Sequence, residues 1–391
     1  MPLRFQGDDA WPESARGELF GLEPNRPRAW ISHGSEAHDF GPAVDRSASC
    51  GLELGHFPEL LAQTAYRTDP TRFVAIPECF ALPGSGIAFG RTGALYDPAT
   101  QAARWLSPKL ANIAEFAQSE SSCVARGSVL KTATIYRGCY LLLQHSGYRN
   151  FGHWMMDCLP GAYVLADEIR AGRLRVLCAP LAPWHRQTLA AIGLPAECVV
   201  ECGTGMVRAD RLIVPSLLGM GGFAHPSNLL AECYGAIRRR HEAVPQAPER
   251  LYVSRDDIAS SRHMRNEAQL IDELTRRGFT VIRPAGMPIA DQIRAFAAAK
   301  IIVGPHGSGM FNAVYAAPGA RVIEISPAIA NPRLWIARLC GLMGHRYAGV
   351  VVAVAEHDRE ERRLGDVIRR NLNFRYDADI AAVVRAIETI G

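Results

Sequence analysis

Apolar runs of four or five residues alternate with amphipathic stretches from about residue 140 onward, and this pattern predicts strands alternating with helices. Each crossover between parallel strands must return along one face of the sheet, so the spacing favours a parallel α/β sheet. In the first half of the pattern the predicted strands are 140–144, 175–178 and 211–214, and the predicted helices are 152–170 and 183–192.

The same alternation is clearer after residue 250 and predicts a second α/β unit. A final helix over about 378–390 would begin at Asp377 or Asp379 as its N-cap. The predicted strands of this unit are 251–254, 280–282, 300–303 and 321–325, and the predicted helices are 267–277, 288–299 and 309–316.

Three segments are expected along the chain. Residues 1–130 form an irregular and β-rich N-terminal segment, in which apolar pieces between Phe73 and Ala94 alternate with Pro and Gly and suggest hairpins. Residues 131–244 form one α/β domain and 245–391 another, divided at a polar stretch that holds Pro245 and Pro248. A chain of 391 residues exceeds the size at which one core stops growing, which also favours two domains.

Charge and cysteine usage narrow the class of protein. The formal net charge of +4, from 43 basic and 39 acidic residues, is too small to suggest nucleic-acid binding. The ten cysteines are scattered singly without a C-x-x-C pair, which fits a reducing compartment. No signal-like or membrane-spanning apolar run occurs, so a cytoplasmic protein is expected. Peripheral association with the inner face of a membrane and self-association are left open.

A strand running through a small-residue turn into a helix, over 301–312, carries the strongest chemical signal. Open backbone N–H groups at a helix N-terminus favour an anion, and glycines allow a phosphate to approach closely. In a parallel sheet such a site lies beyond the carboxyl ends of the strands. The predicted phosphate-binding residues are His306, Gly307, Ser308 and Gly309, although a tight connection with a packed histidine would give the same pattern.

Several side chains are predicted to accompany this turn at the same rim. Arg255 presents a planar fork suited to phosphate oxygens, unless it pairs with Asp256 or Asp257. The further candidates are Ser254, Asn266, Asn312 and Glu324, of which Glu324 could accept from a ribose hydroxyl. The structural alternatives for Asn266, Asn312 and Glu324 are an N-cap, an exposed helix position and an ion pair, respectively.

In the first unit, Asn150-Phe151-Gly152-His153 lies just after a strand and enters a helix. His153 and Asp157 are spaced i, i+4 and share one helix face, where either side chain could act as a general base toward a hydroxyl. Asp157 is the first candidate for the base and His153 the second. A pair on the helix surface without function is the alternative.

Taken together, Asn150-Phe151-Gly152-His153 with Asp157, Tyr252-Val253-Ser254-Arg255, Asn266-Glu267 and Val303–Gly309 resemble glycosyltransferase family 61 over about 135–326. The resemblance implies a GT-B-like α/β fold of two Rossmann-like domains whose parallel sheets face each other across a cleft. It also implies an inverting transfer from a UDP-sugar to a glycan hydroxyl, with no required cofactor or metal, in bacterial surface or capsular polysaccharide synthesis.

Carried over by position, the resemblance places the donor diphosphate against Arg255, His306, Gly307, Ser308 and Gly309, with His153 and Asp157 on the acceptor side. Two departures from the family are Ser308, where Ala is commoner, and the lack of the N-terminal membrane anchor of secretory-pathway members.

Other classes of function fit the sequence less well. The only Asp-x-Asp, at 377–379, precedes a helix and is typical of a cap rather than of a metal site. An esterase would need G-x-S-x-G, which is absent, and the spacing of Gly304, Gly307 and Gly309 fits a dinucleotide fingerprint poorly. The remaining alternative is a non-catalytic module that binds a carbohydrate or nucleotide-sugar.

Overall fold

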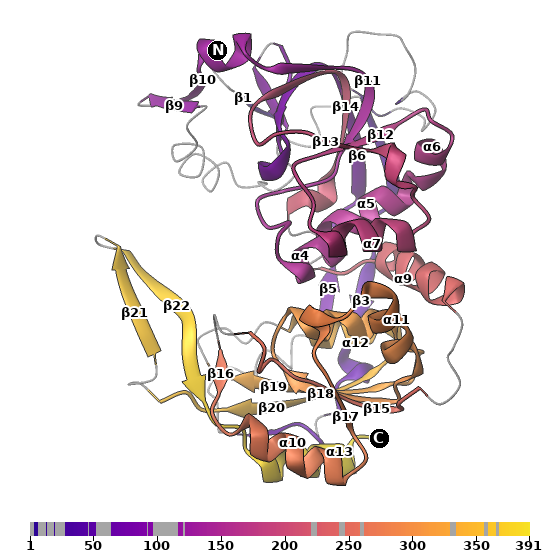
Figure 1. Cartoon of the computed structure of the whole chain (residues 1–391), viewed down its shortest axis with the longest axis vertical. Coiled ribbons are helices and arrows are strands. Elements are labelled where there is room, and N and C mark those ends of the chain that lie inside the picture. Colours follow the sequence, from indigo (N-terminus) through magenta and orange to yellow (C-terminus); the bar gives the residue numbers. More distant parts are fainter. Residues whose placement is uncertain are drawn as a thin grey trace. The chain divides into compact units, whose positions relative to one another are not determined.

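The computed structural model describes residues 4–6, 13, 19, 28–45, 47–51, 64–91, 93–96, 116–119, 122–219, 225–241, 247–258, 262–328, 334–355, 359–364 and 367–391 (Figure 1). The chain forms two compact units. Unit 1 comprises Met1–Glu36 and Thr68–Cys233, and unit 2 comprises Ala37–Arg67 and Tyr234–Gly391. Helix α9 (Asn228–Arg240) runs across this division.

Unit 1 contains a mixed sheet whose strand order is β1-β8-β7-β6-β14-β11-β12-β13, with β2 also paired to β6. Its parallel half is built from β14 (Val207–Pro215), β11 (Thr134–Leu142), β12 (Arg175–Cys178) and β13 (Val199–Glu201). The N-terminal strands pair along the other edge of β14, so they extend this sheet. These strands are β1 (Arg4–Gln6), β2 (Arg28–His33), β6 (Thr71–Leu82), β7 (Ile87–Phe89) and β8 (Ala94–Tyr96).

The hairpin expected between Phe73 and Ala94 is confirmed, because β6 and β7 are antiparallel and are joined by the short helix η4 (Pro83–Ser85). Gly86 closes this turn with a φ of 76°, which glycine adopts without strain. The rest of unit 1 comprises β9 (Phe116–Ser119), β10 (Ser122–Ala125), α3 (Gly127–Lys131), α7 (Pro183–Ala191), η6 (Ala196–Cys198) and η7 (Ser216–Gly219).

The helix predicted over 152–170 is confirmed in outline, but it is made of α4 (Phe151–His153), the π-helical turn η5 (Trp154–Cys158), α5 (Leu159–Val164) and α6 (Ala166–Arg170). The wide turn follows from Pro160, which lacks an N–H and whose ring clashes with the carbonyl four residues earlier. The Leu159 N–H instead bonds to the Trp154 carbonyl, five residues back. Such π-turns are frequent at functional sites.

Unit 2 contains a sheet in which every strand is parallel, in the order β17-β15-β18-β19-β20-β4. The strands β15 (Arg250–Val253), β17 (Thr280–Ile282), β18 (Ile301–Pro305) and β19 (Arg321–Pro327) confirm the predicted ones within a few residues. The edge strand β4 (Cys50–Gly51) comes from the N-terminal part of the chain. Because β15 lies between β17 and β18, the strand order reverses between β15 and β18.

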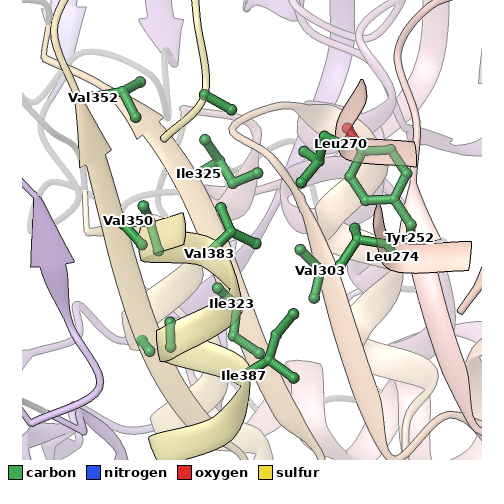
Figure 2. Packing of buried hydrophobic residues seen from close by; sticks show 14 of the residues in the cluster. Tyr252, Leu270, Leu274, Val303, Ile323, Ile325, Val350, Val352, Val383 and Ile387 are labelled. Atoms are coloured by element: carbon green, nitrogen blue, oxygen red, sulfur yellow. The ribbon is translucent and has the colours of Figure 1, made fainter. Parts of the chain in front are cut away.

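Helices cover both faces of this sheet: α10 (Glu267–Arg276) and α13 (Ile380–Thr389) lie on one, and α11 (Ile289–Ala298) and α12 (Trp335–Met343) on the other (Figure 1). Figure 2 shows Val383 and Ile387 of α13 packed against Ile323, Ile325 and Val350 of the strands. Burial of this apolar surface stabilises the fold by about 25 cal/mol per Å² and so holds in place the strand ends that carry the site.

Elements that the sequence did not predict complete unit 2. Helix α12 and β20 (Arg346–Val352) are nearly all apolar, so no polar period marks them. The others are short or lie outside the main sheet: β3 (Ala37–Asp39), η3 (Gly41–Ala43), β5 (Ala65–Arg67), β16 (His263–Met264), η8 (Pro284–Gly286), β21 (Arg359–Leu364) and β22 (Val367–Tyr376).

The helix predicted over 309–316 is a 3-10 helix, η9 (Ser308–Tyr315), rather than an α-helix. Asp379 is the N-cap of α13, since its Oδ1 accepts from the Ala382 N–H at 2.9 Å. No helix among the described residues is both long and apolar enough to span a bilayer.

Acidification is expected to destabilise the fold through two buried histidines. Burial lowers the pKa of His185 and of His345 from 6.5 to about 4, so each folded site binds fewer protons than the unfolded chain between these values. The free energy of unfolding should therefore fall by about 1.4 kcal/mol per histidine for each pH unit from 6.5 down to 4. Urea unfolding at pH 7, 6 and 5 measures this slope.

His345→Gln is the matched variant, because Gln can keep the hydrogen bond that His345 Nε2 donates to the Ala313 carbonyl at 3.0 Å but cannot take up the proton. The pH dependence of its unfolding should be smaller by one histidine. An unchanged slope would contradict the assignment.

Candidate functional site

In unit 2 the side chains predicted for the anion site lie at the carboxyl ends of β15 and β18, where the strand order reverses. Ser254 and Arg255 follow β15, and His306 and Gly307 follow β18, its parallel neighbour. Loops diverge at such a point and leave a crevice that binds ligands in α/β proteins. The structure therefore brings Arg255 and the Gly-rich turn together, as the sequence predicted.

Glycine at 307 leaves room for the Arg255 side chain, while its backbone angles are extended and do not call for glycine. A Cβ there would overlap the Arg255 guanidinium, whose Cζ would lie at 3.1 Å from it. A Cβ at position 309 would similarly lie only 3.2 Å from Val253 Cγ1. Ser308 begins η9, the first turn of which offers backbone N–H groups beside the guanidinium.

A second half-buried arginine, Arg262, lies near enough to Arg255 for their charges to interact. Burial, and then the charge of Arg255, lower the pKa of Arg262 to about 10. Burial also lowers the pKa of Arg255. Arg262 has a φ of 56°, which a residue with a Cβ rarely adopts, and its Nε is buried without a hydrogen-bond partner among the described residues. Two partly desolvated cations held near each other can bind a polyanion.

Glu267, at the start of α10, organises the Arg255 strand end. Its buried Oε1 accepts from the Tyr252 hydroxyl at 3.0 Å, the Ser254 hydroxyl at 2.8 Å and the Arg255 N–H at 3.1 Å. Ser254 therefore braces the turn that presents Arg255. Asp256, one of the two alternative partners predicted for Arg255, instead binds Arg283 through two hydrogen bonds.

Glu324, at position four of β19, is buried and holds His306. Its Oε1 accepts from His306 Nδ1 at 2.6 Å, and its Oε2 accepts from the Tyr347 hydroxyl at 2.8 Å. Each carboxylate oxygen therefore accepts a hydrogen bond from within the protein. The Nδ1–H bond orients the His306 ring, whose side chain is 22% exposed, with Nε2 available to donate when protonated.

The two predicted asparagines make internal hydrogen bonds. The Asn266 amide bonds to both backbone groups of Ala378, at 2.9 Å and 2.8 Å, and makes no side-chain cap to α10. Asn312, within η9, is fully buried, and its Nδ2 donates to Gln292 Oε1 and to the Gly309 carbonyl. These bonds tie α10 to the segment before α13, and η9 to α11.

In unit 1, His153 and Asp157 meet as the sequence predicted. Asn150 caps the helix, its Oδ1 accepting from the His153 N–H at 3.3 Å. The π-turn then carries Asp157 into the interior, where its carboxylate is 0% exposed, while His153 is 20% exposed. His153 Nδ1 donates to Asp157 Oδ2 at 3.0 Å. A carboxylate bound to Nδ1–H orients the ring and leaves Nε2 as its basic atom.

His145, which the sequence analysis missed, completes a cluster with this pair. It follows β11, and its Nε2 lies 3.5 Å from Asp157 Oδ2. The ring packs edge-on against that of His153 at 5.4 Å, and a Cβ at Gly147 would meet both rings. The signal that could have found it is its place at the carboxyl end of the predicted strand 140–144.

One ligand atom of each of these three residues lies within 4.8 Å of the others, a spacing that could suit a metal ion. The hydrogen bonding of His145 opposes this use. Its Nδ1 accepts from the Gly147 N–H at 3.1 Å, so the proton of the neutral ring is on Nε2, the atom that would have to bind the metal. In this cluster the ring N–H groups of His145 and His153 instead both face the Asp157 carboxylate.

Comparison with known families matches residues 151–323 to the family described as Glycosyltransferase 61. The matched range includes His153 and Asp157 of unit 1 and Arg255, Arg262 and His306 of unit 2. It ends one residue before Glu324. No curated protein matches the chain.

Proposed function

We propose, from the premise that residues 151–323 form a glycosyltransferase family 61 domain, that this protein transfers a sugar from a UDP-sugar to a glycan hydroxyl with inversion and without a metal ion. As a glycosyltransferase it binds a sugar donor and an acceptor; the choice of UDP, the inversion and the glycan acceptor are the proposal. The feature that most strongly supports it is the pair of half-buried arginines, Arg255 beside the Gly-rich turn and Arg262 near Arg255.

His153 is the proposed general base. The acceptor hydroxyl oxygen attacks the anomeric carbon, its proton passes to His153 Nε2, and the bond from that carbon to the β-phosphate oxygen breaks with its electron pair on the diphosphate. Asp157 was the first candidate from the sequence, but its carboxylate is fully buried and bonded to His153. A base must meet the acceptor, and of the two side chains His153 is the exposed one.

The diphosphate is proposed to bind at Arg255, Arg262, His306 and the N–H groups of 307–309. Developing charge on the leaving diphosphate is stabilised by preorganised donors, and arginines in a dry site do this without a metal. Ser254 and Glu267 hold Arg255 in place, and Glu324 holds His306.

The wider setting is also part of the proposal. Each unit contains a largely or wholly parallel α/β sheet, which is compatible with the GT-B architecture that the family resemblance implies. Buried free thiols, as at Cys79, Cys158, Cys178 and Cys340, support a cytoplasmic location, and surface polysaccharide synthesis is the proposed process.

The proposal is tested by donor binding and turnover in EDTA. One UDP-sugar should raise the melting temperature, and UDP should be released slowly by hydrolysis and faster with an acceptor. The rate should stay within about twofold when EDTA replaces added Mg²⁺ or Mn²⁺, since arginines neutralise the diphosphate. A shift without UDP release would favour a non-catalytic binding module, and loss of turnover in EDTA would overturn the metal-independent mechanism.

A further inference from the structure

The Asp157 carboxylate lies between two imidazole rings, and only one of them has a role in the proposed reaction. His153 Nδ1 and His145 Nε2 both approach the same oxygen, Oδ2, at 3.0 Å and 3.5 Å. His145 is 7% exposed, so it cannot itself meet an acceptor. Anything it contributes must pass through Asp157.

The tautomer of His145 is fixed by the chain around it. Because Nδ1 accepts from the Gly147 N–H, Nε2 carries a proton and faces Asp157 as a donor. This buried N–H has no hydrogen-bond partner within the described part of the chain, and it lies 3.5 Å from Asp157 Oδ2. Gly86 packs on the other side, where a Cβ would lie 3.1 Å from the His145 Cα and Cβ.

We propose that His145 is a positioning residue for sugar transfer, which donates its Nε2–H to Asp157 and so holds that carboxylate in place against His153 Nδ1–H. The inference rests on the proposed role of His153 as base. When His153 takes the acceptor proton, the Asp157 carboxylate beside Nδ1 stabilises the imidazolium. A second donor on Oδ2 fixes the carboxylate in this position, and hydrogen bonds that are long in a ligand-free site commonly tighten during catalysis.

Two variants of His145 separate its two hydrogen bonds. Asn can present an oxygen near the Nδ1 position and keep the Gly147 N–H bonded, but it has no donor at the Nε2 position. Gln can present an amide N–H near the Nε2 position, but it leaves the Gly147 N–H without its acceptor. His145→Asn therefore tests the donor to Asp157, and His145→Gln is the control that restores it.

His145→Asn is expected to lower kcat about 10- to 100-fold with the KM for donor and acceptor within about twofold. His145→Gln should keep kcat within about threefold of the native value. Equal losses in both variants, or full activity of His145→Asn, would overturn the inference. Melting temperatures of both variants show that each is folded.

A double-variant cycle separates this inference from the proposed function. In the His153→Ala background, His145→Asn should leave the residual rate unchanged, because a positioning residue acts only through the base. A further drop of the same size would mean that His145 acts independently and would contradict the inference. Native-like activity of His153→Ala alone would instead refute the proposed base, and a lost His153→Ala rate with full His145→Asn activity would refute only the inference.

Discussion

Sugar transfer by the His153→Ala protein is expected to be about 10²- to 10⁴-fold slower than by the native protein, because the acceptor hydroxyl loses its general base. The melting temperature gain on donor binding should remain, since the base lies in unit 1 and the proposed donor site in unit 2. Steady-state rates and thermal shifts on the same preparation measure the two effects separately.

Imidazole supplied in solution should restore part of the activity to His153→Ala, and it should not restore Asp157→Asn, in which the His153 ring is still present but has lost its carboxylate. This contrast distinguishes the two candidates for the base. Rescue of neither variant, with His153→Ala retaining more than about a tenth of kcat, would assign the base to another residue.

Replacement of Arg262 by Gln is expected to weaken donor binding and to stabilise the ligand-free protein. A charge-assisted hydrogen bond contributes about 1.5–3 kcal/mol, so the Kd for UDP and UDP-sugar should rise about 10- to 150-fold, while that for uridine, which has no phosphate, should not change. Burial and the neighbouring Arg255 charge disfavour the cation in the folded state. Its removal should therefore raise the free energy of unfolding by about 1–3 kcal/mol.

Arg265→Gln is the control for this variant, because Arg265 is an exposed arginine that pairs with Asp377. Such pairs contribute about 0–1 kcal/mol, so neither donor affinity nor stability should change much. Arg255→Gln should resemble Arg262→Gln in its loss of affinity. If Arg262→Gln bound UDP as the native protein does, Arg262 would have no place in the donor site.

Local sequence patterns were sufficient to predict the strands and helices of the repeating α/β part of the fold. Strands β15, β17, β18 and β19 and helices α10, α11 and α13 lie close to their predicted ranges, since apolar period and Gly or Asp end signals act within a few residues. Helix α12 and strand β20 were missed because their residues are nearly all apolar. A nearly continuous apolar run has no regular polar period to reveal it.

These local patterns could not predict which distant segments of the chain pair as strands. Strand β6 extends the sheet of unit 1 through β14, and β4 adds to the sheet of unit 2 through β20. Nothing in a strand's own residues specifies its neighbour when the two are more than a hundred residues apart. For the same reason the N-terminal strands could not be assigned to either sheet beforehand.

By itself the sequence determined which chemical groups stand at strand and helix ends: His153 and Asp157 on one helix face, and Arg255 and the His306 turn at the carboxyl ends of parallel strands. Only the tertiary structure decided their roles. It buried Asp157 behind His153, engaged Glu324 with His306 and Tyr347, and brought Arg262 near Arg255 and His145 beside Asp157. Packing between segments far apart in the chain determines how deeply a charged group is buried and which groups surround it. A local sequence pattern cannot predict either property.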